Sequence, residues 1–390
     1  MYDLLVQGGK VIDVAQGIYG QSDIAIYQGE IASVAPNIDS NQTKRKIDAT
    51  GKIVTPGLID IHAHVTGGLT PFGVDPEEDG VFSGVTTVCD GGSTGPANFT
   101  EFNKLIIQRA KTDVFCFLAL HPTGQTTLPE DWNHYEVDAP ATLKTIAENR
   151  RQVKGVKVRA VAAVAEKYGV QLVKLGKEIA AEAGVPLVVH IGKDPAENAS
   201  EEMMESLTRE VLSLLNKGDI LVHIYTPKMG QAIKPDGSVL SELKEAIERG
   251  VILDLAQGSG NLSFSIARKV LDMGIFPSTL STDISTIFPF PGLALTRIMS
   301  AFLALGMSLE KVIETTTVNP ARALGEEHRR GSLRTGMPAD ITILEPSGGD
   351  FTFVDSVNTT IKGNLLLTPR MTLKSGVEIQ PKQPENRTKN

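Results

Sequence analysis

Cysteine is scarce in this chain of 390 residues, which contains two, Cys89 and Cys116. Two cysteines cannot build the disulfide framework that holds small secreted domains together. Each of them lies within an apolar run, Val-Thr-Thr-Val-Cys89 and Val-Phe-Cys116-Phe-Leu. We therefore expect two buried, reduced packing residues.

Long apolar runs and an excess of basic residues are also missing. No segment approaches the roughly 20 apolar residues that a membrane-spanning helix needs. The first five residues, Met1-Tyr2-Asp3-Leu4-Leu5, do not resemble the basic and apolar regions of a signal peptide. The net charge of −8 argues against a general nucleic-acid-binding surface, which should be basic. We expect a cytoplasmic protein that binds neither membrane nor nucleic acid.

The first 55 residues read as short strands broken by glycine turns. Residues 3–14 contain two apolar runs on either side of a Gly-Gly pair, and residues 23–34 repeat that plan. Both patterns predict β-hairpins. Strand character returns at residues 339–344, so we expect the two ends of the chain to pair.

Between these ends, short β-rich runs alternate with helical stretches, including residues 99–110, 161–183, 201–216 and 240–249. Helices are also expected at residues 292–305 and 308–316. The predicted strands are residues 58–62, 86–90, 114–120, 156–160, 186–190, 220–223, 251–255 and 278–282.

Eight βα units in series predict a (β/α)8 TIM barrel. The sequence thus predicts an α/β fold with two parts. Residues 56–329 form the catalytic barrel, and residues 1–55 and 330–390 form a small β-sandwich domain.

Two histidines, His62 and His64, end the first predicted barrel strand. Side chains two residues apart on a strand point to the same face, so both imidazoles should enter one site. Active sites of barrels lie at the carboxyl ends of the strands, and imidazole is a common zinc ligand. A chance His-x-His pair is the alternative, and its position after residues 55–60 argues against chance.

His190 and His223 end the fifth and sixth predicted strands. A single histidine in such a place is more often a hydrogen-bonded core residue. However, the chain has seven histidines in all, and four of them fall at the ends of the first, fifth and sixth predicted strands. Asp283 follows the eighth predicted strand, where it is either a loop carboxylate or a metal ligand that accepts a proton from bound water.

Lys157 and Arg159 share one face of the fourth predicted strand, Gly155-Val156-Lys157-Val158-Arg159. A lysine inside a barrel costs free energy unless its charge is neutralised. Reaction with CO2 would convert it to an anionic carbamate that can bridge two metals. Arg159 could bind a substrate carboxylate or phosphate. The alternative, that both side chains extend to solvent, is equally compatible with the spacing.

These residues together resemble the amidohydrolase superfamily. The most specific motif is Pro56-Gly57-Leu58-Ile59-Asp60-Ile61-His62-Ala63-His64. Asn319-Pro320-Ala321 and the segment from Gly331 to Ile341 support it. Within the superfamily the chain looks closest to the amidohydrolase/deacetylase group related to dihydroorotases. Gln257 and Ser285 depart from that group's pattern, which leaves the substrate open.

The resemblance implies a centre of two divalent metal ions, with zinc as the expected metal. His62, His64 and Asp283 would bind the first ion, His190 and His223 the second, and carboxylated Lys157 both. It implies hydrolysis of an amide or ester bond by a hydroxide between the metals, with Asp283 transferring the proton. From their positions on the predicted strands, Arg159 and His121 are expected to contact a small-molecule substrate. His121 ends the third predicted strand, and Arg159 would bind a carboxylate of the substrate.

Three alternatives stay open on the sequence. They are a cyclic-amide hydrolase of the dihydroorotase or hydantoinase type, a deaminase, and a catalytically silent scaffold. Lys157 argues against a deaminase, and the filled ligand positions argue against a silent scaffold. Two glycine-rich segments, residues 91–95 and 258–261, are interpreted as flexible walls of the substrate pocket. The sequence leaves open whether the chain forms homo-oligomers.

Overall fold

The computed structural model describes residues 1–128, 130–193, 199–286 and 294–382. The first two residues of the predicted helix 292–305 lie outside this range. So do the last eight residues of the predicted β domain.

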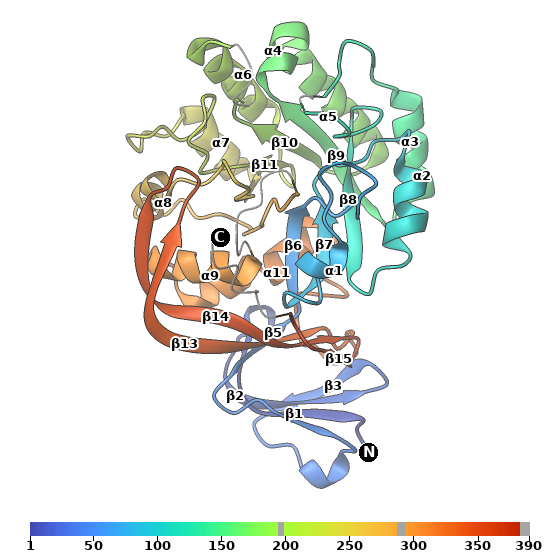
Figure 1. Ribbon diagram of the computed structural model, residues 1–390, viewed down its shortest axis with the longest axis vertical. Helices are drawn as coiled ribbons and strands as arrows, with labels where there is room; N and C mark the ends of the chain where they lie inside the picture. The colour runs from blue at the N-terminus through green and yellow to red at the C-terminus, as the bar shows by residue number, and fades with distance from the viewer. Residues whose placement is uncertain (129, 194–198, 287–293, 383–390) are drawn as a thin grey trace, which may run out of the picture.

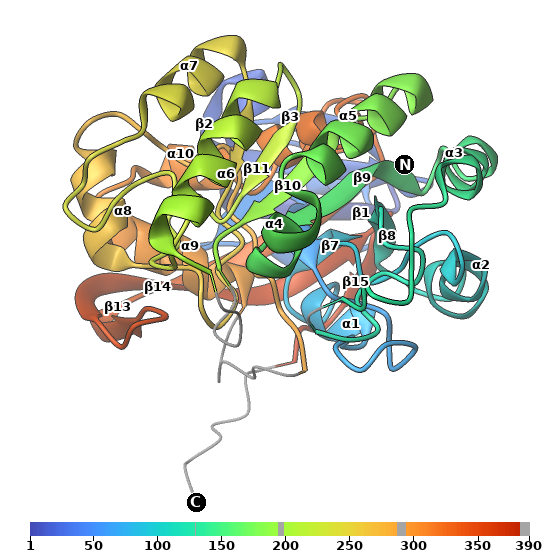
Figure 2. The same cartoon turned by 90° about the horizontal axis from the view of Figure 1, so that it is seen from above.

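The centre of the molecule is a curled sheet of seven parallel strands, which follow one another in chain order from β6 to β12. Figures 1 and 2 show these strands with helices on their outer side. Each strand lies within two or three residues of its predicted position. The strands are β6 (Leu58–Ala63), β7 (Val85–Asp90), β8 (Asp113–Ala119), β9 (Val153–Ala160), β10 (Leu187–Ile191), β11 (Ile220–Val222) and β12 (Ile252–Asp254).

The eighth predicted strand, residues 278–282, is an irregular segment rather than a strand. Its backbone still bonds to both edges of the curled sheet. The N–H of Leu255 beside β12 donates to the Thr279 carbonyl at 3.0 Å, and the N–H of Asp283 donates to the His62 carbonyl of β6 at 2.6 Å. The residue after the segment, Asp283, has a positive φ of 52°, which is outside the β region.

Eleven helices are found among the described residues. The predicted helix 161–183 is split, because Gly169 has a left-handed φ of 54° and ends the first half. The helices are α1 (Pro76–Asp79), α2 (Phe99–Phe102), α3 (Ala139–Glu148), α4 (Ala162–Tyr168), α5 (Gln171–Ala183), α6 (Glu201–Leu214), α7 (Ser241–Arg249), α8 (Phe264–Leu271), α9 (Leu295–Ala304), α10 (Leu309–Glu314) and α11 (Val318–Ala323).

The apolar core lies on both faces of the curled sheet. Leu58, Val88 and Leu118 pack outward against the helices, whereas Ile59 and Phe117 pack inside the curl. This arrangement explains the nearly continuous apolar runs of the strands, since both faces are buried. The two cysteines are buried and free, as predicted.

The two ends of the chain pair with each other, as expected. Strand β5 lies against β13 and joins the N-terminal and C-terminal strands in one mixed sheet of eight strands. The strands are β1 (Leu4–Asp13), β2 (Ile18–Tyr27), β3 (Glu30–Ala35), β4 (Lys46–Asp48), β5 (Ile53–Pro56), β13 (Ile341–Val354), β14 (Thr360–Lys374) and β15 (Val377–Ile379).

Two details of the predicted β domain differ from the structure. The second predicted hairpin is present as β2 and β3, but the first is wrong: β1 is one strand whose register shifts between Val6 and Gly9. The pairing gives one continuous sheet, and the predicted sandwich of two sheets is not confirmed.

The long ribbon of β13 and β14 leaves this sheet and runs along the side of the molecule (Figure 1). Near α9, the N–H of Leu367 donates to the Ser300 hydroxyl at 2.9 Å. At the ribbon tip, Asp355 accepts a hydrogen bond of 2.8 Å from the N–H of Phe264, the first residue of α8. The ribbon therefore ties the terminal sheet to the loop that precedes α8.

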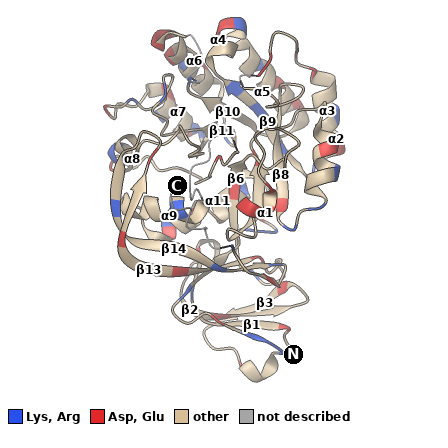
Figure 3. Ribbon diagram, viewed as in Figure 1, with Lys and Arg blue, Asp and Glu red and all other residues tan. Residues whose placement is uncertain are grey.

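Charged residues of both signs are scattered over the helices and the terminal sheet in Figure 3, without a face of one sign in that view. Among the described helices, none combines the length and the apolar character that crossing a lipid bilayer requires.

Candidate metal centre

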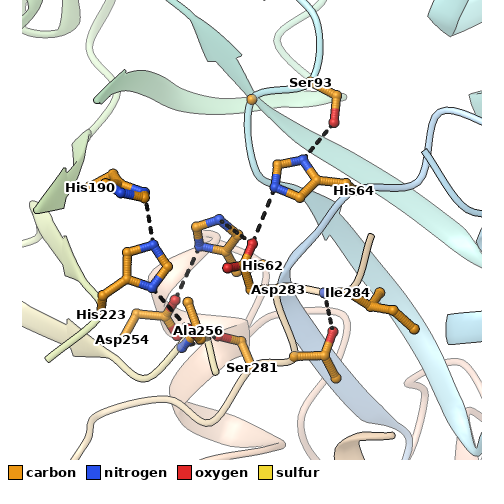
Figure 4. A network of polar contacts seen from close by, with 12 residues as sticks. His62, His64, Ser93, His190, His223, Asp254, Ala256, Ser281, Asp283 and Ile284 are labelled. Atoms are coloured by element: carbon orange, nitrogen blue, oxygen red, sulfur yellow. Dashed lines mark hydrogen bonds and ion pairs between the residues drawn. The ribbon is translucent and has the colours of Figure 1, made fainter. Parts of the chain in front are cut away.

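His62 and His64 meet Asp283 where the edges of the curled sheet come together (Figure 4). Atom Nε2 of His62 lies 3.7 Å from Oδ1 of Asp283, and Nε2 of His64 lies 3.2 Å from the same oxygen. One possible ligand atom from each of the three residues lies within 4.8 Å of the other two. The two histidines thus enter one site, as their spacing predicted.

The far side of the His62 ring faces an acceptor. Its Nδ1 lies 3.3 Å from Oδ2 of Asp254. Asp254 is itself held by hydrogen bonds of 2.7 Å from the hydroxyls of Thr279 and Ser281. A proton on Nδ1 leaves the Nε2 lone pair of His62 directed at Asp283. A lone pair and a carboxylate that face each other repel unless a proton or a cation lies between them.

His190 and His223 form a second pair, on neighbouring strand ends. Nδ1 of His190 lies 2.8 Å from Nε2 of His223, whose Nδ1–H donates to the Ala256 carbonyl at 2.8 Å. Burial lowers the pKa of both rings well below the ordinary value. They are therefore neutral, which is the form that binds metals.

The backbone at these positions is unusual. His223 has a φ of 69° and Asp283 a φ of 52°, and neither residue is a glycine. Such conformations cost about 1–3 kcal/mol and occur preferentially at functional sites. A second unusual feature is Nε2 of His190, a buried nitrogen without a hydrogen-bond partner among the described residues.

Lys157 lies on β9 with its side chain inside the curl. Its Nζ is 3.2 Å from Nε2 of His62. Burial lowers the pKa of Lys157 to about 8, although the nearby carboxylates of Asp283 and Asp254 oppose the shift. A neutral amine is therefore accessible at moderately alkaline pH.

Asp283 is an ionised carboxylate at neutral pH. Burial acts to raise its pKa, but the contact with His64 and the electrostatic influence of His62 and His223 lower it below the ordinary range. The adjacent loop is built to fit this side chain: a Cβ at Gly258 would lie 2.5 Å from Oδ2 of Asp283.

The glycine-rich segment 91–95 packs closely on His62 and Lys157, and its Gly92 lines a cavity beside Lys157. A Cβ at Gly91 would collide with the His62 ring, and one at Gly92 would lie 2.7 Å from Cγ of Lys157. The hydroxyl of Ser93 lies 2.7 Å from Nδ1 of His64. Glycine is needed here because the backbone packs directly on ligand side chains.

The two predicted substrate residues line one narrow cavity together with Lys157. Arg159 donates from Nη1 to Oε2 of Glu130 at 2.7 Å, and both side chains are buried. The His121 ring packs edge-on against Trp132, with ring centres 4.7 Å apart. Arg159 thus already has one carboxylate partner within the chain.

Four residues of this site were missed on the sequence. Asp90 ends one predicted strand and Asp254 is the residue before the end of another, so a signal like that of the histidines was available for them too. Ser93 follows Asp90 in a loop, and its role depends on the neighbouring strand. Glu130 lies in a long loop with no periodic pattern.

Comparison with known proteins gives consistent relatives. Residues 53–378 match the model of the amidohydrolase family. A deacetylase of Brucella anthropi is 34% identical over 350 residues, which are 88% of this chain and 83% of that protein.

Two solved structures share the fold over nearly the whole chain. A dihydroorotase has a TM-score of 0.86 and 30% identity, and covers 100% of both chains. An adenine deaminase has the same TM-score and identity, over 97% of this chain and 100% of that one.

Proposed function

Because this chain belongs to the amidohydrolase family, we propose that it is a metal-dependent hydrolase that removes an acyl group from an amide or ester, as a deacetylase does. The observation that carries the proposal is the convergence of His62, His64 and Asp283, whose lone pairs face one another. The relatives named deacetylase agree with it.

The donor atoms suit divalent cations. His62, His64 and Asp283 would hold one ion, and His190 and His223 a second. Imidazole and carboxylate suit zinc, and they also accept manganese or iron. When bound, such ions polarise a substrate carbonyl and lower the pKa of water.

Lys157 would bind both ions after it has reacted with CO2. Two features support this. Its Nζ lies 3.2 Å from Nε2 of His62, a ligand of the first ion, and its side chain is buried, where an ammonium would repel both cations. A carbamate would replace that positive charge with a negative one.

Asp283 would transfer the proton. Its carboxylate is ionised at neutral pH and lies beside His62 and His64. It can therefore accept a proton from the attacking water at Oδ1 or Oδ2. The same carboxyl then delivers the proton to the departing amine or alcohol. The space for this side chain depends on Gly258, because a Cβ at that position would lie 2.5 Å from Oδ2.

A substrate carboxylate would be met by basic side chains near the second histidine pair. Arg159 and Lys228 both contribute to the lowered pKa of His190, after burial and the influence of His223. Arg159 retains the substrate-binding role predicted for it, and His121 lines the same cavity.

A cyclic-amide hydrolase is the second candidate, favoured by the dihydroorotase that shares the fold at 30% identity. The adenine deaminase is equally similar, which keeps a deaminase in consideration. The buried lysine beside His62 argues for the two-metal hydrolases over a deaminase with one metal.

We also infer that residues 56–329 form the catalytic domain. In this domain the irregular segment 278–282 would take the place of the eighth strand of a (β/α)8 barrel. Residues 1–55 and 330–390 would form the second domain. The backbone bonds of Thr279 and Asp283 to the two sheet edges support a closed barrel.

Metal analysis tests the proposal directly. Protein purified with bicarbonate should contain two divalent ions per chain, and Lys157→Ala should contain fewer. One ion per chain in both proteins would contradict the two-metal centre. Hydrolysis of N-acetyl amino acids and acyl hydroxy acids, with dihydroorotate, hydantoins and adenine as competitors, then separates the candidate substrates.

A further inference from the structure

A buried chain of hydrogen bonds lies behind His64, on the side away from Asp283 (Figure 4). Nδ1 of His64 lies 2.7 Å from the Ser93 hydroxyl oxygen. That hydroxyl lies 2.8 Å from Oδ2 of Asp90. Asp90 and Ser93 are fully buried, and His64 is 7% exposed, so bulk water does not compete for these contacts.

The carboxylate of Asp90 is the acceptor in each of its hydrogen bonds among the described residues. Its Oδ1 accepts from the N–H groups of Gly92 at 3.1 Å and Ser93 at 2.7 Å. Its Oδ2 accepts from the N–H of Val65 at 3.0 Å and from the Ser93 hydroxyl. Three fixed backbone donors therefore hold the carboxylate in one orientation.

These contacts fix the direction of the whole chain. A carboxylate has no proton to give, and a serine hydroxyl has one. Ser93 must donate that proton to Asp90, because otherwise two acceptor oxygens would face each other at 2.8 Å. The Ser93 oxygen is then an acceptor for His64, whose Nδ1 must carry the ring proton.

We propose that Asp90, acting through the Ser93 hydroxyl, holds His64 in the tautomer protonated on Nδ1, with its Nε2 lone pair directed at the metal centre. The inference rests on the proposed metal centre for its purpose, but the proton on Nδ1 follows from the contacts of Ser93 and Asp90 in the metal-free protein. Asp90 and Ser93 are positioning residues: they act through His64 and lie behind it.

This chain of hydrogen bonds, called the relay below, differs from the contact that supports the His62 ring. His62 faces Asp254 directly, at 3.3 Å, without an intervening hydroxyl. A change at Ser93 should therefore affect His64 and leave His62 unchanged. This makes His62 an internal control in the same molecule.

The tautomer can be observed directly by ¹⁵N NMR of metal-free protein labelled in its histidine rings. The chain has seven histidines, so the spectrum contains few signals. The signals that disappear in His64→Gln are those of His64. In the unsubstituted protein we expect the His64 Nδ1 to carry a proton, whether or not Nε2 shares a second proton with Asp283, whose Oδ1 lies 3.2 Å away. A His64 ring protonated on Nε2 alone would overturn the proposal.

Two substitutions test the relay. Asp90→Asn can turn an N–H toward Ser93, so that the hydroxyl donates to His64 and the ring proton moves to Nε2. Ser93→Ala removes the relay with a small loss of volume, and should leave His64 as a mixture of tautomers. Ser93→Thr keeps the hydroxyl and should restore the original signal. Unchanged His64 signals in both Asp90→Asn and Ser93→Ala would contradict the proposal.

Metal affinity gives a second readout. Competition with a chelator should show zinc binding weakened about 10–100-fold in Ser93→Ala, as expected when a group supporting a ligand is lost, and recovered in Ser93→Thr. Unweakened zinc binding in a Ser93→Ala protein with mixed tautomers would overturn the link to the metal. If the unsubstituted protein binds no metal while the tautomer behaves as stated, the proposed function fails and the relay stands.

Discussion

The amine of Lys157 and the imidazole of His62 lie in contact inside the curled sheet, with Nζ 3.2 Å from Nε2. Each of these two buried basic groups disfavours a positive charge on the other, so they are unfavourable neighbours when both are protonated. An anionic carbamate on Lys157 with a cation between the two residues would remove the conflict. The first two predictions test this relationship.

Lys157→Ala should lose nearly all hydrolytic activity, because the bridge between the two metals is gone. A small carboxylate such as acetate or propionate, added at high concentration, should restore part of the activity and of the second metal, since it can occupy the space of the lost carbamate. Steady-state rates and metal content measure both effects. Lys174→Ala, on the exposed side of α5, is the matched control and should behave like the unsubstituted protein. Full activity of Lys157→Ala would refute the bridge.

Metal uptake by metal-free protein should depend on pH through Lys157. CO2 reacts with a neutral amine, and the pKa of Lys157 is lowered to about 8. Below that pH the ammonium dominates, so the rate of uptake at fixed dissolved CO2 should rise about tenfold per pH unit from pH 6 toward 8 and then level off. Burial keeps His190 and His223 neutral over this range, so they should not impose the same dependence. Time courses of metal incorporation provide the measurement, and a flat profile would argue against a carbamate.

Asp283→Asn should lower kcat about 10²–10⁴-fold while the fold is retained, because the amide cannot accept the proton. Asparagine suits this position, since it tolerates the positive φ of 52° that Asp283 adopts. The pKa of Asp283 is lowered, so its carboxylate stays ionised down through pH 5 and should not produce a loss of activity above that pH. Rates over pH 5–9 and a thermal melt check both points. A variant that keeps its kcat would remove Asp283 from the proton transfer.

The strands of the curled sheet could be predicted from the sequence because buried parallel strands are short apolar runs between helices. The period of two along β6 also predicted that His62 and His64 enter the same site. The eighth predicted strand, residues 278–282, was wrong, because the segment is irregular. Its geometry depends on hydrogen bonds from the hydroxyls of Thr279 and Ser281 to Asp254. Asp254 lies on β12, and such contacts between segments leave no periodic pattern in the sequence.

The hydrogen bond between Ser93 and His64 could not be predicted from the sequence for a similar reason. Ser93 reaches His64 because β6 and β7 are adjacent, with a register shift between Asp60 and Ala63 that the sequence does not reveal. The metal ligands themselves, the carbamate on Lys157 and the roles of Arg159 and His121 stay predictions. The structure brings these side chains together, and the experiments above decide their chemistry.

The ion pair between Arg159 and Glu130 allows a test of the proposed binding of a substrate carboxylate by Arg159. Removing one partner of a buried ion pair typically costs about 3–5 kcal/mol, so Glu130→Gln should lower the free energy of unfolding markedly. If Arg159 also binds the substrate carboxylate, Arg159→Met should raise KM at least tenfold for an N-acetyl amino acid and leave KM nearly unchanged for its neutral amide. Arg209→Met, on the outer face of α6, serves as control for the loss of an arginine. An equal change in KM for both substrates would mean that Arg159 supports the site without contacting the carboxylate.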